Sequence, residues 1–151
     1  MTAVSAILSA LHLLALALGL GSVSARGRAL AGPLDAAGIK QALQADSAWG
    51  IAALLWITTG PARAFGPFEK GTEYYVHNSL FLVKMGLFLL VFLIELWPMI
   101  TLIGWRMARK RGAAPDLTHA RTFAMLSRLE AGLVAVIVFV AAFMARGFGT
   151  R

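Results

Sequence analysis

Two opposite charges, Lys84 and Glu95, interrupt a largely apolar stretch that runs from residue 75 to residue 105. A lone charge at bilayer depth costs on the order of 2.5–3.5 kcal/mol, so such side chains are normally paired or put to use. A helix turns ~100° per residue, which places His77, Lys84 and Glu95 on one face. Lys84 and Glu95 lie ~16 Å apart along that helix, too far to pair with each other. We therefore expect both to meet partners on other helices.

The first apolar stretch carries a second candidate group, His12, on a face of small and polar residues: Ser5, Ser9, His12, Leu16 and Gly19. His12 and Lys84 are expected at a similar depth, and Arg63 falls at the end of the second apolar stretch. These three side chains predict a pocket for an anionic or electron-rich ligand in the outer half of the membrane. In this interpretation His12 is an axial ligand or proton carrier, Arg63 pairs with an acidic substituent, and Lys84 neutralises charge or transfers a proton. Hydrogen-bonded packing of His12 is the alternative.

A structural ion pair is predicted between Glu95 and Arg128. Both lie ~15 Å from the cytoplasmic side when measured along their helices. Pairing with each other would by itself offset the free-energy cost of placing two charges in the bilayer. A proton relay is the competing interpretation. Glu130 is then available to a different neighbour, and Asp46 is expected to cap a helix.

The composition is that of a membrane protein, with 59% hydrophobic and 14% charged residues in 151. The absence of Cys excludes disulfides, thiolate metal sites and iron–sulfur clusters. The net charge of +7 lies beside apolar segments rather than on a soluble basic face, so no nucleic-acid partner is expected. No metal motif, phosphate-binding loop or hydrolytic triad is found, and no metal site is predicted.

Four segments are long enough to cross a bilayer at ~20 residues each: 3–25, 43–60, 75–105 and 118–145. We expect an all-α polytopic protein, a single four-transmembrane-helix bundle over residues 1–151. Asp35 predicts the start of a short amphipathic helix before the second span, and Asp116 predicts the cap of the fourth.

The distribution of basic residues sets the expected orientation. The first and third loops with their flanks hold Arg26, Arg28, Lys40, Arg106, Arg109, Lys110, Arg111 and Arg121, against Arg63, Lys70, Arg146 and Arg151 on the other side. By the positive-inside rule, loops 26–42 and 106–117 are cytoplasmic and both termini are periplasmic, in a bacterial inner membrane.

Several short motifs resemble those of a bacterial membrane family, domain of unknown function 2214. They are D-x-x-x-G at 46–50, T-G-x-x-R at 59–63, E-K-G-x-x-Y-Y at 69–75, N-x-x-F-x-x-K at 78–84 and G-W-R at 104–106. The resemblance covers nearly the whole chain and implies an inner-membrane protein, but no activity.

A more distant likeness is to the haem-containing J-type protoporphyrinogen oxidase of bacteria. That family has a His where His12 stands, a Lys where Lys84 stands and an acidic residue where Glu130 stands. The likeness implies haem b or a porphyrin as cofactor. The family also has a His two residues before the Lys, where this chain has Leu82.

Three functions follow as hypotheses from these patterns. The first is binding of haem, a porphyrin or a quinone-like ligand by His12, Arg63 and Lys84. The second is a non-enzymatic accessory or scaffold subunit of a membrane complex, in which polar residues lock helices together. The third is a small transporter or proton-conducting protein that uses Lys84, Glu95 and Glu130. A homo-oligomer or a larger membrane complex is expected in each case, with the lipid bilayer as the surrounding partner.

Overall fold

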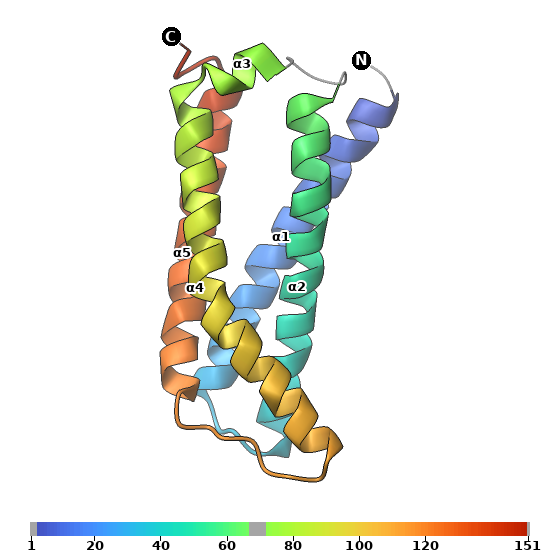
Figure 1. Ribbon diagram of the computed structural model, residues 1–151, viewed down its shortest axis with the longest axis vertical. Helices are drawn as coiled ribbons and strands as arrows, with labels where there is room; N and C mark the ends of the chain where they lie inside the picture. The colour runs from blue at the N-terminus through green and yellow to red at the C-terminus, as the bar shows by residue number, and fades with distance from the viewer. Residues whose placement is uncertain (1–2, 67–71, 151) are drawn as a thin grey trace.

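Long helices packed side by side dominate the computed structural model, which describes residues 3–66 and 72–150 (Figure 1). The helices are α1 (Ala3–Ala31), α2 (Ala36–Phe65), α3 (Thr72–Val76), α4 (Ser79–Lys110) and α5 (Ala120–Ala145). The antiparallel pair α1 and α2 lies beside a second antiparallel pair, α4 and α5. Within the described ranges no strand forms, only an isolated bridge between Asn78 and Thr150. The prediction of an all-α protein is confirmed.

The turn between α1 and α2 is short, and Asp35 caps the second helix as predicted. Its carboxylate accepts hydrogen bonds from the backbone N–H groups of Ala37 (3.0 Å) and Gly38 (2.8 Å). A Cβ at Gly38 would collide with the carbonyl oxygen of Pro33, so the tight turn requires glycine there. However, α2 is one continuous helix from Ala36 onwards. The separate amphipathic helix is therefore a wrong prediction, because no breaker after Ala36 stops the helix from propagating.

The other boundaries also differ from the predicted spans. Asn78, not Tyr75, starts α4, because its side-chain oxygen accepts from the N–H groups of Leu80 (2.9 Å) and Phe81 (3.3 Å). Asp116 does not cap α5, which begins at Ala120 without a side-chain cap. The Asp116 carboxylate instead accepts hydrogen bonds from the hydroxyl and the N–H of Thr118, which lowers the pKa of that carboxyl.

A bend divides α4 into two parts. Pro98 lies buried inside the helix, where it removes one backbone N–H donor and crowds the preceding turn. Beyond the bend, the C-terminal part of α4 crosses obliquely toward α2 (Figure 1). The bend therefore brings the end of α4 to the other helix pair.

Three of the described helices, α1, α4 and α5, are long and apolar enough to cross a membrane. The second predicted span is not among them, because α2 carries Lys40, two glutamines, Asp46 and Arg63 along its length. Most large exposed side chains are hydrophobic, among them Leu14, Ile100 and Phe139. Exposed apolar surface on this scale is expected of helices surrounded by lipid.

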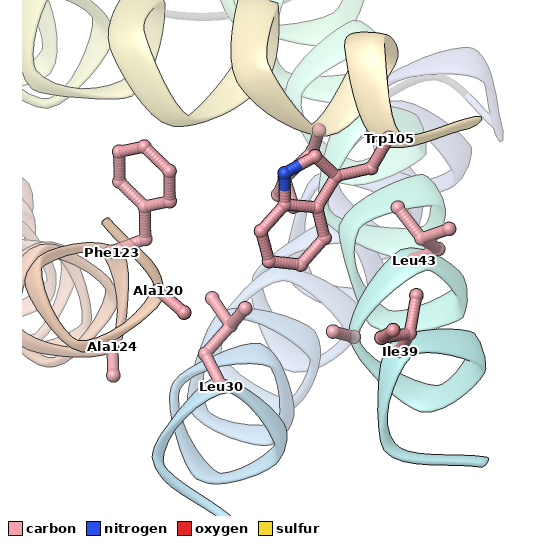
Figure 2. Packing of buried hydrophobic residues seen from close by; sticks show 9 residues of the cluster. Leu30, Ile39, Leu43, Trp105, Ala120, Phe123 and Ala124 are labelled. Carbon is pink, nitrogen blue, oxygen red and sulfur yellow. The ribbon is translucent and has the colours of Figure 1, made fainter. Parts of the chain in front are cut away.

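Three hydrophobic clusters hold the helices together. The cluster at the α1–α2 turn is shown in Figure 2, where the Trp105 ring projects from α4 toward Leu30 of α1. Its buried members are Leu30, Ile39, Ala42, Leu43, Leu102, Trp105, Ala120, Phe123 and Ala124. A middle cluster joins Val23, Trp49, Val91 and Val134, and the cluster at the opposite end joins Ala64, Tyr75, Phe81 and Met144.

Two glycines allow α1 to approach its neighbours closely. A Cβ at Gly27 would lie 3.2 Å from Ser127 Cβ and 3.4 Å from the Ala124 carbonyl oxygen of α5. A Cβ at Gly19 would lie 2.5 Å from the Trp56 ring of α2. Small residues at such contacts are typical of packed membrane helices.

Replacing Gly27 by Leu is expected to push α1 away from α5 and to lower the free energy of unfolding by ~1–3 kcal/mol through overpacking. Gly132→Leu is the matched control, since a Cβ there meets nothing within 4 Å. Thermal unfolding of both variants in the same detergent makes the measurement. Equal melting temperatures for the two would contradict the close contact.

Candidate functional site

A single guanidinium group, that of Arg26, occupies the interior where the long helices meet. Arg26 is fully buried, with no exposed surface. Its Nη1 donates to Asp46 Oδ1 and Glu95 Oε1, both at 2.8 Å. Its Nη2 donates to Glu95 Oε2 at 2.6 Å and Glu130 Oε2 at 2.7 Å, and its Nε donates to Ser127 Oγ at 3.0 Å. Every N–H direction of the guanidinium is therefore directed at an oxygen.

Each long helix contributes to this group of side chains, which we call the Arg26 cluster. Arg26 comes from α1, Asp46 from α2, Glu95 from α4, and Ser127 and Glu130 from α5. The two α5 residues are three apart and so lie on one face of their helix. The cluster is therefore a contact point common to both helix pairs.

Asp46 extends the cluster toward the surface. Its Oδ1 binds Arg26, and its Oδ2 accepts from Arg106 Nη2 at 2.8 Å. The Arg106 side chain is 30% exposed and also donates to the Leu43 carbonyl and the Ser47 hydroxyl. Asp46 is thus a bridge between a buried and a partly exposed arginine rather than the helix cap that we predicted.

Glu130 is the least satisfied member of the cluster. Its side chain has no exposed surface, and Oε1 has no hydrogen-bond partner among the described residues. Glu95 and Glu130 each place an oxygen on the same nitrogen, Arg26 Nη2, so the two carboxylates are close neighbours. With both arginines charged, Asp46, Glu95 and Glu130 give the Arg26 cluster three negative charges against two positive, a formal charge of −1.

The predicted ion pair of Glu95 with Arg128 is corrected by this geometry. Glu95 binds Arg26, while Arg128 is exposed. Arg128 and Glu130 are two residues apart, which is ~200° around the helix, so they cannot face the same neighbour. Only Glu130 points toward the interior.

The sequence pattern predicts Arg26 in the first loop, because the apolar stretch ends before it. The structure continues α1 to Ala31 and buries the side chain. A signal was present in the sequence: His12, Gly19 and Arg26 are spaced seven residues apart, so the small polar face of the first helix runs on to Arg26. Basic residues just after an apolar stretch normally lie at the membrane interface, so the position of Arg26 in the sequence favoured an interfacial side chain over a buried one.

The three residues of the predicted ligand pocket lie at the opposite end of the helices from the α1–α2 turn. His12 is partly buried, and its Nδ1 lies 2.7 Å from the Thr59 hydroxyl of α2. Arg63 is four residues after Thr59 and so shares the face of α2 that contacts His12. Lys84 belongs to α4, which runs apart from α2 at this end (Figure 1).

A groove of ≈ 500 Å³ separates α2 and α4 between the middle cluster and the cluster at Ala64 and Phe81. It is lined by Ile57, Met85, Gly86, Phe88, Leu89 and Phe92. Lys84 adjoins this lining in the chain, whereas His12 and Arg63 are not part of it. No three His, Asp or Glu side chains in residues 3–66 and 72–150 are grouped as a metal site.

The family comparison covers almost the whole chain. Residues 4–149 match the family described as predicted membrane protein (DUF2214). The chain belongs to this family. No curated protein and no solved structure matches it, so the likeness to the J-type oxidase stays a prediction.

Residues of the motifs that resemble the DUF2214 family make specific polar contacts in the structure. Asp46 of the first motif binds Arg106 of the last. Thr59 of the second motif hydrogen-bonds His12. Asn78 caps α4 and donates to the Phe148 carbonyl at 3.0 Å, tying the C-terminal segment to α4. Glu69, Lys70 and Gly71 of the remaining motif lie outside the described residues.

Replacing Arg26 by Met is expected to destabilise the protein by ~3–5 kcal/mol, because three carboxylates lose the buried cation that compensates them. Arg121→Met is the matched control, since it removes the same charge from an exposed side chain at the start of α5. Unfolding in detergent compares the two variants. Similar stability of both would show that the Arg26 cluster does not hold the helices together.

Proposed function

We propose that this DUF2214 protein is a small proton-coupled protein of the bacterial inner membrane, which binds and releases one proton at Glu95 and Glu130. The observation that carries the proposal is the charge balance of the Arg26 cluster. Fully ionised, the cluster is left with one buried negative charge, and one proton makes it neutral. A buried uncompensated charge is costly, whereas a neutral carboxyl group is much less so.

The geometry supports Glu130 as the proton-binding group. Among the described residues no group donates a hydrogen bond to its Oε1, so a proton can bind that oxygen without displacing Arg26 from Oε2. Glu95 and Glu130 both accept hydrogen bonds from Arg26 Nη2. The Glu95 side chain is 14% exposed, so Glu95 connects the buried Glu130 carboxyl group to the surroundings of the protein. Asp46, which binds Arg26 through one oxygen and Arg106 through the other, completes the charged groups of the cluster. The acidic pair is therefore the exchangeable part of the cluster.

We further propose that all four long helices cross the membrane. The helix α2 runs antiparallel beside α1 along most of its length (Figure 1), and its central charge, Asp46, is buried and paired. The buried Arg26 no longer counts as a loop charge. Arg28, Lys40, Arg106, Arg109, Lys110, Arg111 and Arg121 still outnumber Arg63, Lys70, Arg146 and Arg151. The α1–α2 turn is therefore proposed to be cytoplasmic and both termini periplasmic.

The scaffold hypothesis uses the same residues differently. An Arg26 cluster that only locked the helices would need its charges but no exchangeable proton. Assembly into a homo-oligomer or a larger complex stays a prediction under either function. The two functions therefore predict different effects of Glu130→Gln, which removes an oxygen that can bind a proton.

Glu130→Gln is expected to abolish proton movement while leaving the protein folded, since Gln is isosteric and makes the cluster neutral without a proton. The protein is placed in phosphatidylglycerol–phosphatidylcholine vesicles containing a pH-sensitive dye, and a potassium gradient with valinomycin drives proton entry. Glu73→Gln is the control, because its side chain is 95% exposed. Equal proton entry with wild-type, Glu130→Gln and protein-free vesicles would reject proton coupling and leave the scaffold function.

A second candidate function is binding of a flat apolar ligand in the groove between α2 and α4. Its volume lies within the range of small-molecule sites, and its Phe and Met lining suits a quinone-like ring. For haem b or a porphyrin, the hydrogen bond from His12 Nδ1–H to the Thr59 hydroxyl, which itself donates to the Leu55 carbonyl, leaves Nε2 as the coordinating nitrogen. Leu82 and the exposed His77 supply no second ligand in the expected place. The residues present fit one axial ligand.

Protein purified in mild detergent is expected to show a Soret band if haem is bound, and His12→Ala is expected to remove it. His77→Ala is the control, since its exposed ring contacts only Glu73 among the described residues. Absorption spectra of the three proteins make the comparison. A colourless wild-type protein from haem-replete cells would reject haem, and a band that survives His12→Ala would reject His12 as its ligand.

A further inference from the structure

A second groove, of ≈ 780 Å³, runs between α1 and α2 at the end where these helices join. Its lining includes Ala17, Gly21 and Ala25 of α1 and Gln41, Gln44 and Ala48 of α2. Arg28 lies at the end of the groove near the turn. None of these residues belongs to the Arg26 cluster, so the groove is separate from the proposed proton site.

The end of the groove near the turn carries polar side chains that are free to bind a ligand. The side chains of Arg28, Gln41 and Gln44 are exposed. Within residues 3–66 and 72–150 these three side chains form no hydrogen bond or ion pair. Gln44 lies three residues beyond Gln41, toward the membrane centre, so one face of α2 carries two amides without partners. These exposed amides can therefore hydrogen-bond to a polar ligand.

The rest of the groove is lined mainly by small apolar residues. Ala17, Gly21 and Ala25 leave room because their side chains are small, and a Cβ at Gly21 would meet nothing within 4 Å. From Arg28 to Ala17 the groove follows ~16 Å of helix. This is the shape required for an extended hydrocarbon chain that points from the membrane surface toward its centre.

We infer that this groove binds one anionic phospholipid. The Arg28 guanidinium binds the phosphate, the Gln41 and Gln44 amides hydrogen-bond to the headgroup and ester oxygens, and an acyl chain lies along Ala25, Gly21 and Ala17. Charge complementarity supports the assignment, because the groove lining contains a cation and no Asp or Glu. Lys40, Arg109, Lys110 and Arg111 make the same end of the molecule basic, as at other sites for anionic headgroups.

A second copy of the chain is a less suitable occupant. In a two-fold dimer the same surface meets itself, so each copy would bring its Arg28 to an interface whose groove lining offers no carboxylate. A phospholipid supplies the missing negative charge.

The test compares phosphatidylglycerol with phosphatidylcholine of identical acyl chains. Purified full-length protein in detergent is mixed with each lipid, and bound lipid is counted by native mass spectrometry. We expect one phosphatidylglycerol per chain and weaker binding of phosphatidylcholine. Arg28→Gln should weaken phosphatidylglycerol binding about fivefold, the effect of one basic residue near a membrane surface. Arg121→Gln, an exposed arginine outside the groove, should leave it unchanged.

Gly21→Leu provides an independent variant, because a Cβ at Gly21 meets nothing within 4 Å and the larger side chain would occupy the groove that Gly21 lines. It should reduce binding of the lipid while melting temperature in lipid-free detergent stays the same. Equal binding of the two lipids, or equal effects of Arg28→Gln and Arg121→Gln, would overturn the inference. A dimer cross-linked through cysteines introduced at position 21 would overturn it in favour of a second copy.

Discussion

The guanidinium group of Arg26 joins all four long helices of the protein. It binds side chains of α2, α4 and α5 while its own helix, α1, fixes its position. Such a group is costly to bury alone and is stabilised here by three carboxylates and the Ser127 hydroxyl. The close approach of α1 to α5 at Gly27, one residue further on, belongs to the same constraint, because the Arg26 Nε–Ser127 hydrogen bond requires the two helices to lie close together.

The same constraint leads to the proposed chemistry. Arg26 and Arg106 compensate two of the three carboxylates, and Glu130 keeps a buried oxygen that accepts no hydrogen bond from residues 3–66 or 72–150. A cluster that is one charge short of neutrality is a natural binding site for a proton. Structure and function would then depend on the same residues, with Arg26 holding the helices together and Glu130 carrying the exchangeable proton. The apolar groove between α2 and α4 lies away from the Arg26 cluster, toward the opposite end of the helices.

Much of the helical architecture was readable from hydropathy and turn residues, as at Asp35, because these signals are local in the chain. The partners of the buried charges were not readable in the same way. The expected pairing of Glu95 used depth alone, whereas the actual partner depends on which helices are neighbours and how each is rotated. Arg26 carried a periodic signal with His12 and Gly19, but its place after an apolar stretch favoured an interfacial position. The bend of α4 at Pro98 brings the C-terminal part of that helix to α2. No local sequence pattern predicts the direction in which a helix continues after such a bend.

The protonation state of Glu130 tests the central claim most directly. Infrared spectroscopy of the protein in lipid bilayers at neutral pH detects the C=O stretch of a protonated carboxyl group, which ionised carboxylates lack. We expect such a band in the wild-type protein and its loss in Glu130→Gln, where Asp46 and Glu95 alone balance Arg26 and Arg106. Absence of the band from the wild-type protein, or an unchanged band in Glu130→Gln, would contradict the proposal that the Arg26 cluster holds a proton.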